Sequence, residues 1–309
     1  MEDVCVGSSA TALMSSIAWA VAPSEDSNIV STQASFPSTV YPWSRAAESS
    51  GAEVRLAAHD GDMYTDPSSI MSLINEQTAV IVLSHVEYVN GQRYDLESFS
   101  KAAQEVDALL ITDATQSMGM VPIDAPNSGV DAMVASGYKW LRGSFGAAVG
   151  YVSPRLRGLN PGLVGFRSHT DMWDMRPDRV VLPQDASRFE YTTLHFGAAL
   201  GLAEAIKEID AFGIDEVWEH DLALADLIVS GAKGLGFGIA SPTNEAERSA
   251  IVSLRPPEGF DSNALASALR DDQGIIVSSR SGLIRVSPHI DNVPEDIARL
   301  ISALGNVLP

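Results

Sequence analysis

Two side chains that could take part in catalysis, the amine of Lys139 and the carboxylate of Asp113, each stand at the end of an apolar segment. Lys139 follows the segment Asp131 to Ser136, which reads as a buried strand that delivers the amine to the carboxyl edge of a sheet. Ligands of open α/β folds bind at that edge. Burial lowers the pKa of a lysine and frees a neutral amine, which attacks carbonyl groups and forms Schiff bases. The alternative for Lys139 alone is a surface lysine at a strand end.

Asp113 ends the apolar segment Leu109 to Thr112 and lies 26 residues before Lys139. A carboxylate at a buried strand end needs a cationic partner. In enzymes that use pyridoxal phosphate, a carboxylate keeps the pyridinium nitrogen protonated, so that the ring withdraws electrons from a substrate carbanion. Asp113 alone also fits a helix N-cap or a metal ligand. A strand that ends in Asp, followed by a strand that ends in Ser136-x-x-Lys139, is more restrictive and favours the cofactor.

A phosphate group would fit the turn Gly7 to Thr11, which precedes the helical segment Ala12 to Val21. Backbone amides at such a helix start, here around Ser9 and Ala10, bind phosphate, although similar turns also cap helices that bind nothing. The hydroxyl groups of Ser136 and Tyr138, beside Lys139, could add hydrogen bonds to the same phosphate.

Four further side chains are candidates for contacts with a cofactor or substrate. Phe36 follows the strand Asn28 to Thr32 and could stack on a pyridine ring, unless it belongs to the core. Arg280 and Arg285 lie on consecutive strands, and either could bind a substrate carboxylate through two hydrogen bonds; the alternative is surface ion pairing. His85 is expected to border the site or to be a structural histidine at a strand end.

The elements that must position these residues alternate between β-rich and helical segments. Strands are predicted over Asn28 to Thr32, Glu53 to Ala57, Thr78 to Ser84, Ala108 to Thr112, Asp131 to Ser136 and Ala147 to Val152. Helices are predicted over Pro37 to Ser50, Pro67 to Asn75 and Leu96 to Val106. This alternation predicts a three-layer α/β/α fold with a mainly parallel sheet.

The second part of the chain has a different layout. An irregular stretch from Arg155 to Arg188 precedes a predicted helix over Thr192 to Phe212. Helices near Glu216 to Leu235, Asn263 to Asp271 and Pro294 to Leu304 alternate with strands near Ala250 to Leu254, Ile275 to Ser279 and Leu283 to Val286. We therefore predict a large domain over residues 1–205 and a small α+β domain over residues 206–309. No strand or helix is predicted before the turn at Gly7.

Composition excludes several classes of function. The net charge of −20 opposes binding to nucleic acid and to anionic membranes. No apolar run is long enough to span a membrane, and no secretion signal is evident. The single cysteine, Cys5, excludes a disulfide framework and any multi-cysteine metal site, which fits a reducing compartment. We expect a cytoplasmic protein without a metal site.

These features resemble the fold-type I pyridoxal-phosphate enzymes of aminotransferase class V, a family that includes cysteine desulfurases, kynureninases and isopenicillin N epimerase-like proteins. The resemblance covers nearly the whole chain. In order, the matching segments are Gly7 to Ala10, Phe36-Pro37, Ser84 to Val86, Asp113 to Gln116, Ser136 to Lys139, Phe189 to Thr193 and Ile284 to His289.

The resemblance implies a role for each matching residue. Lys139 would carry the cofactor as a Schiff base, Asp113 would pair with its ring nitrogen, Gln116 would donate to its phenolic oxygen and Phe36 would stack on its ring. The phosphate would be bound around Ser9 and Ala10, by Ser136 and Tyr138, and by Thr193 from a second subunit. A homodimer with active sites at the subunit interface is therefore expected. Arg285 would bind the carboxylate of a small amino acid substrate, with Arg280 and His85 as further substrate contacts.

Three departures from the family narrow the expected chemistry. The segment Gly274 to Arg285 lacks the cysteine of desulfurases, which disfavours persulfide formation. Kynureninases resemble one another in a pattern Asp-x-x-His where this chain has Asp113-Ala-Thr-Gln116, so Gln116 stands in place of their histidine. The family also has a longer segment before the phosphate-binding turn, so we expect a more open site or a loss of activity.

We accordingly expect an aminotransferase or a Cβ-lyase, such as a carbon–sulfur lyase. An amino acid epimerase or a kynureninase-like hydrolase is the first alternative. A catalytically silent homologue that serves as a binding partner is the alternative of another class.

Overall fold

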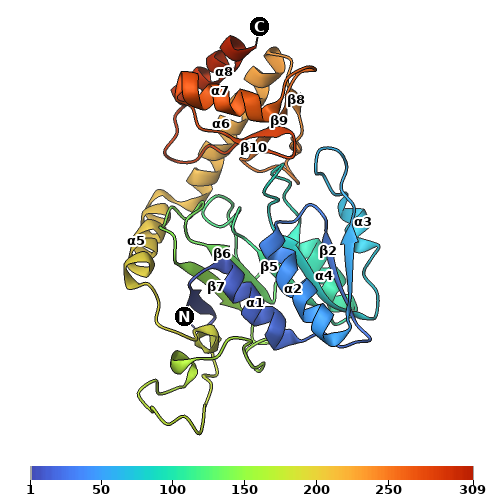
Figure 1. Ribbon diagram of the computed structural model, residues 1–309, viewed down its shortest axis with the longest axis vertical. Coiled ribbons are helices and arrows are strands. Elements are labelled where there is room, and N and C mark those ends of the chain that lie inside the picture. The colour runs from blue at the N-terminus through green and yellow to red at the C-terminus, as the bar shows by residue number, and fades with distance from the viewer. Residues whose placement is uncertain (1, 309) are drawn as a thin grey trace.

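The computed structural model describes residues 2–308 and contains two units, each built around its own sheet (Figure 1). The larger unit holds a seven-stranded sheet with order β1-β7-β6-β5-β4-β2-β3. Its strands are β1 (Val4–Gly7), β2 (Asn28–Thr32), β3 (Glu53–Ala57), β4 (Thr78–Ser84), β5 (Leu109–Asp113), β6 (Ala132–Ser136) and β7 (Ala148–Val152).

Strands β3, β2, β4, β5 and β6, which are neighbours in that order, run parallel to one another. Strand β7 is antiparallel to β6, and β1 is antiparallel to β7. Strands β2 and β6 are buried over their whole length, as expected for inner strands of a sheet that is covered on both faces. The parallel arrangement places the ends of β4, β5 and β6 at one edge of the sheet.

Helices cover both faces of this sheet. Helices α1 (Ala10–Val21) and α2 (Pro37–Ser50) pack on one face around Trp43, which is fully buried. Helices α3 (Pro67–Met71), α4 (Leu96–Glu105) and α5 (Phe196–Phe212) pack on the other face, where α4 contributes Phe99 and α5 contributes Leu202. This arrangement confirms the predicted three-layer α/β/α fold with a mainly parallel sheet.

The smaller unit contains a four-stranded antiparallel sheet with order β10-β11-β9-β8 and its own apolar core. Its elements are α6 (Ile214–Gly234), β8 (Gly238–Ile239), β9 (Val252–Arg255), α7 (Ser262–Gln273), β10 (Ser278–Arg280), β11 (Leu283–Val286) and α8 (Pro294–Val307). A long excursion between β7 and α5 contains two short 3₁₀ helices, η1 (Phe166–Ser168) and η2 (Ala186–Phe189), and it extends from the end of the large unit that faces away from the small unit (Figure 1).

The expectation that no strand precedes the turn at Gly7 is wrong, because β1 pairs with β7 along the edge of the sheet. Strand β1 has only four residues, too few to give a readable alternation of polar and apolar positions. The predicted helix from Thr192 starts later, at Phe196, because the His195 side chain caps it by accepting a hydrogen bond from the Ala198 amide. The short strand β8 was not predicted.

The predicted domain boundary at residues 205 and 206 falls inside α5. Ile209, beyond that boundary, still packs in the core of the large sheet, and the chain turns at Gly213 before α6 enters the core of the small unit. The division of the chain into two domains at that boundary stays a prediction. Within residues 2–308, no helix has the length and apolar character needed to cross a bilayer.

The loop that follows β4 fastens the two units together. The Arg93 amide donates to the Glu247 carbonyl at 2.7 Å, and the Ser253 hydroxyl donates to the Val89 carbonyl at 2.5 Å. Gly91 lies at the centre of this contact, where its carbonyl accepts from the Ser249 hydroxyl at 2.7 Å. A side chain at position 91 would therefore stand between the units.

We predict that Gly91→Ala destabilises the protein more than a matched change elsewhere. Gly91 has a φ of 74°, and a Cβ atom there would lie 2.5 Å from the Ile251 carbonyl oxygen. Gly259 has a φ of 90° with open space around it, so Gly259→Ala carries the backbone strain alone, about 1 kcal/mol. Gly91→Ala should cost about 1–3 kcal/mol more in the free energy of unfolding, measured by denaturant titration. Equal losses in the two variants would show that the loop does not hold the units together.

Candidate active site

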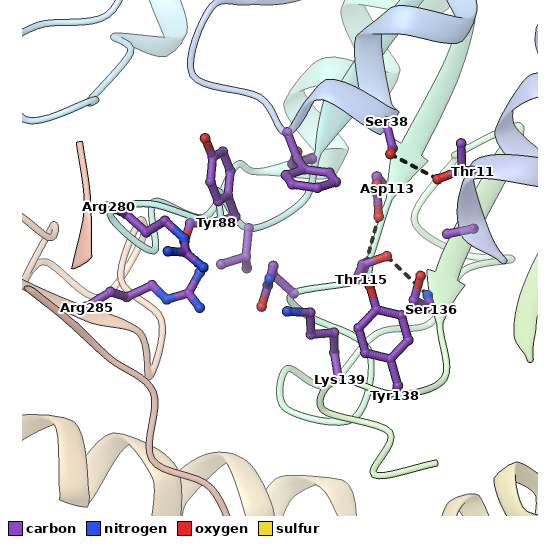
Figure 2. Close-up of a pocket in the computed structure, with 15 residues that line it drawn as sticks. Thr11, Ser38, Tyr88, Asp113, Thr115, Ser136, Tyr138, Lys139, Arg280 and Arg285 are labelled. Atoms are coloured by element: carbon purple, nitrogen blue, oxygen red, sulfur yellow. Dashed lines mark hydrogen bonds between the residues drawn. The ribbon is translucent and has the colours of Figure 1, made fainter. Parts of the chain in front are cut away.

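A cavity of about 280 Å³ lies at the carboxyl ends of β4, β5 and β6, and strands β10 and β11 close it from the small unit (Figure 2). The starts of helices α1 and α2 form another of its walls. Its lining residues are Ala10, Thr11, Phe36, Ser38, Ser84, Val86, Tyr88, Asp113, Thr115, Gln116, Ser136, Tyr138, Lys139, Arg280 and Arg285. The cavity therefore brings together most of the residues that the sequence selects.

Asp113 presents a buried carboxylate to this cavity without a positive partner. Only 6% of the residue is exposed, and its oxygens accept hydrogen bonds from the Thr39 hydroxyl at 3.0 Å and the Thr115 amide at 2.9 Å. Burial raises the pKa of Asp113, and these hydrogen bonds oppose that rise. No Lys, Arg or His among residues 2–308 forms an ion pair with it. A cationic ligand atom at this position would stabilise the carboxylate.

Lys139 follows β6 through a tight turn, and its amine points into the same cavity (Figure 2). Its Nζ lies 5.4 Å from the centre of the Tyr138 ring, and no carboxylate of the described chain pairs with it. The pKa of Lys139 is lowered by burial first, and then by the positive charges of Arg285 and Arg280. A larger fraction of this amine is therefore neutral and nucleophilic than in an exposed lysine.

Gln116 is oriented by its neighbour Trp140. The Trp140 indole N–H donates to Gln116 Oε1 at 2.9 Å, which leaves the amide nitrogen of Gln116 as a donor beside the cavity. Because Trp140 directly follows Lys139, one turn fixes both the amine and this amide donor.

Small polar groups form the wall at the start of α1. Ala10 and Thr11 line the cavity, and the Thr11 hydroxyl donates to the Ser38 hydroxyl at 2.9 Å. Ser136 completes this group from the end of β6. The first amides of a twelve-residue helix and three hydroxyl groups form a suitable site for a phosphate. Thr11 belongs to the predicted turn Gly7 to Thr11 but was not singled out as a ligand, and Ser38 was not selected from the sequence.

Aromatic rings border the rest of the cavity. Phe36 and Tyr88 pack edge to face with their ring centres 5.2 Å apart, and Phe36 remains 45% exposed, so it is not a core residue. Tyr138 stacks on Phe145 with ring centres 4.4 Å apart. Phe36 is thus free to contact a planar ligand.

Arg280 and Arg285 reach the cavity from the small unit. Arg285 Nη1 donates to the Tyr88 carbonyl at 2.6 Å, and this bond links the small unit to the loop after β4. The pKa of Arg285 is lowered by burial and then by Arg280.

Three of the predicted residues, Ser9, Thr193 and His85, do not line the cavity. Ser9 is the N-cap of α1, and its hydroxyl accepts from the Ala12 amide at 3.1 Å. Thr193 is exposed and lies outside the cavity of its own chain.

The expectation that His85 borders the site is wrong. Ser84 and Val86 face the cavity, and the alternation of an extended chain turns His85 to the opposite side. His85 is buried there, its Nδ1 has no partner among the described residues, and burial lowers its pKa to about 3. It is therefore a neutral structural histidine.

Glu87 was not predicted and lies behind the lining residues Val86 and Tyr88. It is fully buried, and Ser35 donates to its Oε1 at 2.8 Å, while its Oε2 has no partner among residues 2–308. Burial raises the pKa of Glu87 to about 8, and the nearby Asp113 adds to this effect. A single acidic residue in a turn gives no sequence signal of such burial.

The residues that line the cavity fit pyridoxal phosphate. Asp113 lacks a cation and would pair with a protonated ring nitrogen, Gln116 offers a donor for an oxygen on the ring, and the start of α1 suits a phosphate. The amine of Lys139 lies among these groups, where it would meet an aldehyde. We therefore regard the cavity as complementary to this cofactor in charge and in hydrogen bonding.

A model of the aminotransferase class-V family matches residues 2–300. A probable cysteine desulfurase from Pyrococcus abyssi is 26% identical over 294 residues, which are 91% of this chain and 72% of that protein. The family match confirms the resemblance predicted from the sequence motifs.

Solved structures share the fold. The cysteine desulfurase of Thermococcus onnurineus, without ligand, superposes with a TM-score of 0.90 at 23% identity and covers 99% of this chain and 79% of its own. The cystine C–S lyase C-DES, in complex with cysteine persulfide, superposes with a TM-score of 0.90 at 20% identity. The superposition covers 99% of this chain and 82% of the lyase. The same lyase with glycine linked to its pyridoxal phosphate gives a TM-score of 0.89 at 19% identity, with coverage of 99% and 81%.

We predict that Glu87→Gln removes a decline in stability with rising pH. Above pH 4.5 the unfolded chain releases the Glu87 proton, whereas the folded protein keeps it up to about pH 8, so the contribution of Glu87 to stability falls across that range. The opposite contribution of His85 is complete above pH 6.5. Between pH 6.5 and 8 the wild type should therefore lose about 2 kcal/mol of unfolding free energy relative to Glu87→Gln.

Denaturant titrations at pH 6.5, 7.25 and 8 measure this difference. Glu105→Gln, a change at an exposed position on α4, is the control and should follow the wild type. Parallel pH profiles for the wild type and Glu87→Gln would mean that the buried carboxyl is not protonated.

Proposed function

The chain belongs to the aminotransferase class-V family, and we propose that it acts on a small amino acid through pyridoxal phosphate held by Lys139. As a member of this family it is a pyridoxal-phosphate-dependent enzyme, a transferase or a lyase. One observation carries the proposal: the amine of Lys139 and the cation-free carboxylate of Asp113 face one cavity from the ends of two adjacent parallel strands.

In this proposal each residue of the cavity has a role in binding or in proton transfer. When bound, the cofactor supplies an aldehyde that condenses with amines and a ring that withdraws electrons. Lys139 would hold it as a Schiff base, Asp113 would keep a proton on its ring nitrogen and Gln116 would donate to its phenolic oxygen. Arg285 would bind the substrate carboxylate. The free amine of Lys139 would then be placed to take the proton from Cα of the substrate.

The fate of that proton and of the substrate side chain defines the reaction. Desulfurases that form a persulfide need a reactive thiol, but Cys5, the only cysteine, is buried in β1, and burial raises its pKa to about 12. No cysteine lines the cavity as described. We therefore propose aminotransferase or carbon–sulfur lyase chemistry without a protein thiol. Product analysis would separate these from the alternatives of epimerisation and kynureninase-like hydrolysis.

We also propose that two chains form a homodimer in which Thr193 completes the partner's phosphate site. The support is that Thr193 is exposed and outside its own cavity, and that α5 and the excursion before it expose large apolar side chains. These are Val164, Phe166, Trp173, Met175, Val180, Val181, Phe196, Leu200, Ile206 and Phe212. Such a surface is typical of an interface. The cytoplasmic location stays a prediction.

The first test is the visible absorbance spectrum of the protein with added pyridoxal phosphate, followed by borohydride trapping and peptide mass mapping. We expect a Schiff-base band in the wild type, with the trapped cofactor on Lys139, and no band in Lys139→Ala. Lys101→Ala, at an exposed position on α4, is the matched control and should keep the band. A folded wild type without a band at saturating cofactor would contradict the proposal and favour a silent binding protein.

Asp113→Asn should retain the Schiff-base band but slow removal of the Cα proton by at least about 100-fold, because the ring nitrogen loses its negative partner. Exchange of the Cα proton in D₂O, followed by proton NMR across a panel of amino acids, measures this step without knowledge of the final product. Asp272→Asn, at an exposed position on α7, is the control. Near wild-type exchange in Asp113→Asn would disprove the role of this carboxylate.

A further inference from the structure

Two guanidinium groups enter the cavity from one face of the β10–β11 hairpin. The register pairs Ser278 with Arg285 and Arg280 with Leu283, so Arg280 and Arg285 lie diagonally on the same face. Figure 2 shows their side chains next to each other, both directed toward the cavity. The fold thus holds two positive groups side by side in a confined space.

Neither of these arginines is neutralised within the described chain. No carboxylate of residues 2–308 forms an ion pair with Arg280 or Arg285, whereas Arg142, also near the junction of the units, binds both Glu208 and Asp291. Arg285 Nε is buried without a hydrogen-bond partner in that range. In a chain with a net charge of −20, two adjacent unpaired guanidinium groups indicate a site for an anion.

The charge of the cavity exceeds what an ordinary amino acid needs. Lys139, Arg280 and Arg285 line it, and Asp113 is its only acidic lining residue. The hydroxyl groups that suit the phosphate, those of Thr11, Ser38 and Ser136, lie on the other side of Lys139 from the arginines (Figure 2). One guanidinium is enough for an α-carboxylate, so the second remains for another acidic group.

The two arginines differ in burial, which suits them to different parts of a substrate. Arg285 is the more buried, and its bond to the Tyr88 carbonyl fixes its guanidinium in the cavity. Arg280 is exposed and donates only to the Ser279 carbonyl at 2.8 Å. The inner arginine suits the α-carboxylate next to the reacting carbon, and the outer arginine suits the end of a side chain.

We propose that the substrate is a dianionic amino acid, with Arg285 on the α-carboxylate and Arg280 on a second acidic group, either a carboxylate or a sulfinate. This inference rests on the proposed function, because it concerns the substrate of the same cavity. Arg280 then determines specificity: it separates acidic side chains from their neutral counterparts of the same length.

Calorimetric titration of the protein loaded with pyridoxal phosphate tests the anion site without turnover. Succinate and butyrate have the same carbon chain but differ in one carboxylate, and neither has an amine that reacts with the cofactor. Wild-type protein should bind succinate about 10- to 100-fold more tightly than butyrate. Arg280→Gln should remove this preference by weakening succinate alone, and Arg285→Gln should weaken both ligands. Arg270→Gln, an exposed arginine of the same unit, should change neither.

The cofactor spectrum distinguishes the two acidic groups. The concentrations at which amino acids perturb the absorbance band are compared for three pairs: aspartate with asparagine, glutamate with glutamine, and cysteine sulfinate with S-methylcysteine, which is neutral, of similar length and without a free thiol. The acid of the matching pair should act at a concentration at least about tenfold lower than its neutral counterpart, and the pair that shows the difference identifies the group.

The outcomes separate this inference from the proposed function. Failure to bind pyridoxal phosphate would disprove the proposed function before any anion is added. Normal cofactor binding with equal affinity for succinate and butyrate in the wild type would overturn this inference alone. A loss of pyridoxal phosphate affinity in Arg280→Gln would also overturn it, because Arg280 would then serve the phosphate.

Discussion

The arrangement of the site depends on one buried carboxylate. Asp113 ends β5 beneath the cavity, where a hydroxyl and a backbone amide donate to it, and no Lys, Arg or His of residues 2–308 forms an ion pair with it. Burial of an unpaired carboxylate costs folding free energy, and a positively charged ligand atom beside it would offset this cost. The parallel sheet sets its position, because β4, β5 and β6 end at one edge, and the neighbouring strand β6 delivers Lys139 to the same cavity. The cofactor proposed for this site supplies the missing positive charge.

The mainly parallel sheet and the ends of its central strands could be predicted from the sequence, and with them the position of Asp113, Gln116, Ser136 and Lys139 at one edge of that sheet. Continuous apolar runs identify strands that are buried on both faces, and parallel strands place their final residues together. The assignment of His85 failed because the residue follows a strand that is buried on both faces, so polarity does not reveal which side chains face the ligand. Glu87 gave no signal, since its burial arises from the loop that contacts the small unit.

Hydroxyl groups near the phosphate wall illustrate a different limit. Ser9 and Thr11 are separated by one residue and look equivalent in sequence, yet the helix start uses the Ser9 hydroxyl as its N-cap and leaves Thr11 beside the cavity. Capping satisfies an amide that otherwise has no partner, so local backbone geometry decides which hydroxyl remains for a ligand. The position of Cys5 also follows from the fold, because this residue is buried in β1 beside β7 and does not line the cavity.

The two halves of the site come from separate stretches of the chain. Every group assigned to the cofactor within one subunit precedes Gly213, whereas both arginines assigned to the substrate follow it. Substitutions in the hairpin that carries Arg280 and Arg285 can therefore alter recognition while the groups around Lys139 and Asp113 stay unchanged. In evolutionary terms, selection can exchange the substrate of this scaffold at the end of the chain and retain the reactive centre that earlier residues provide.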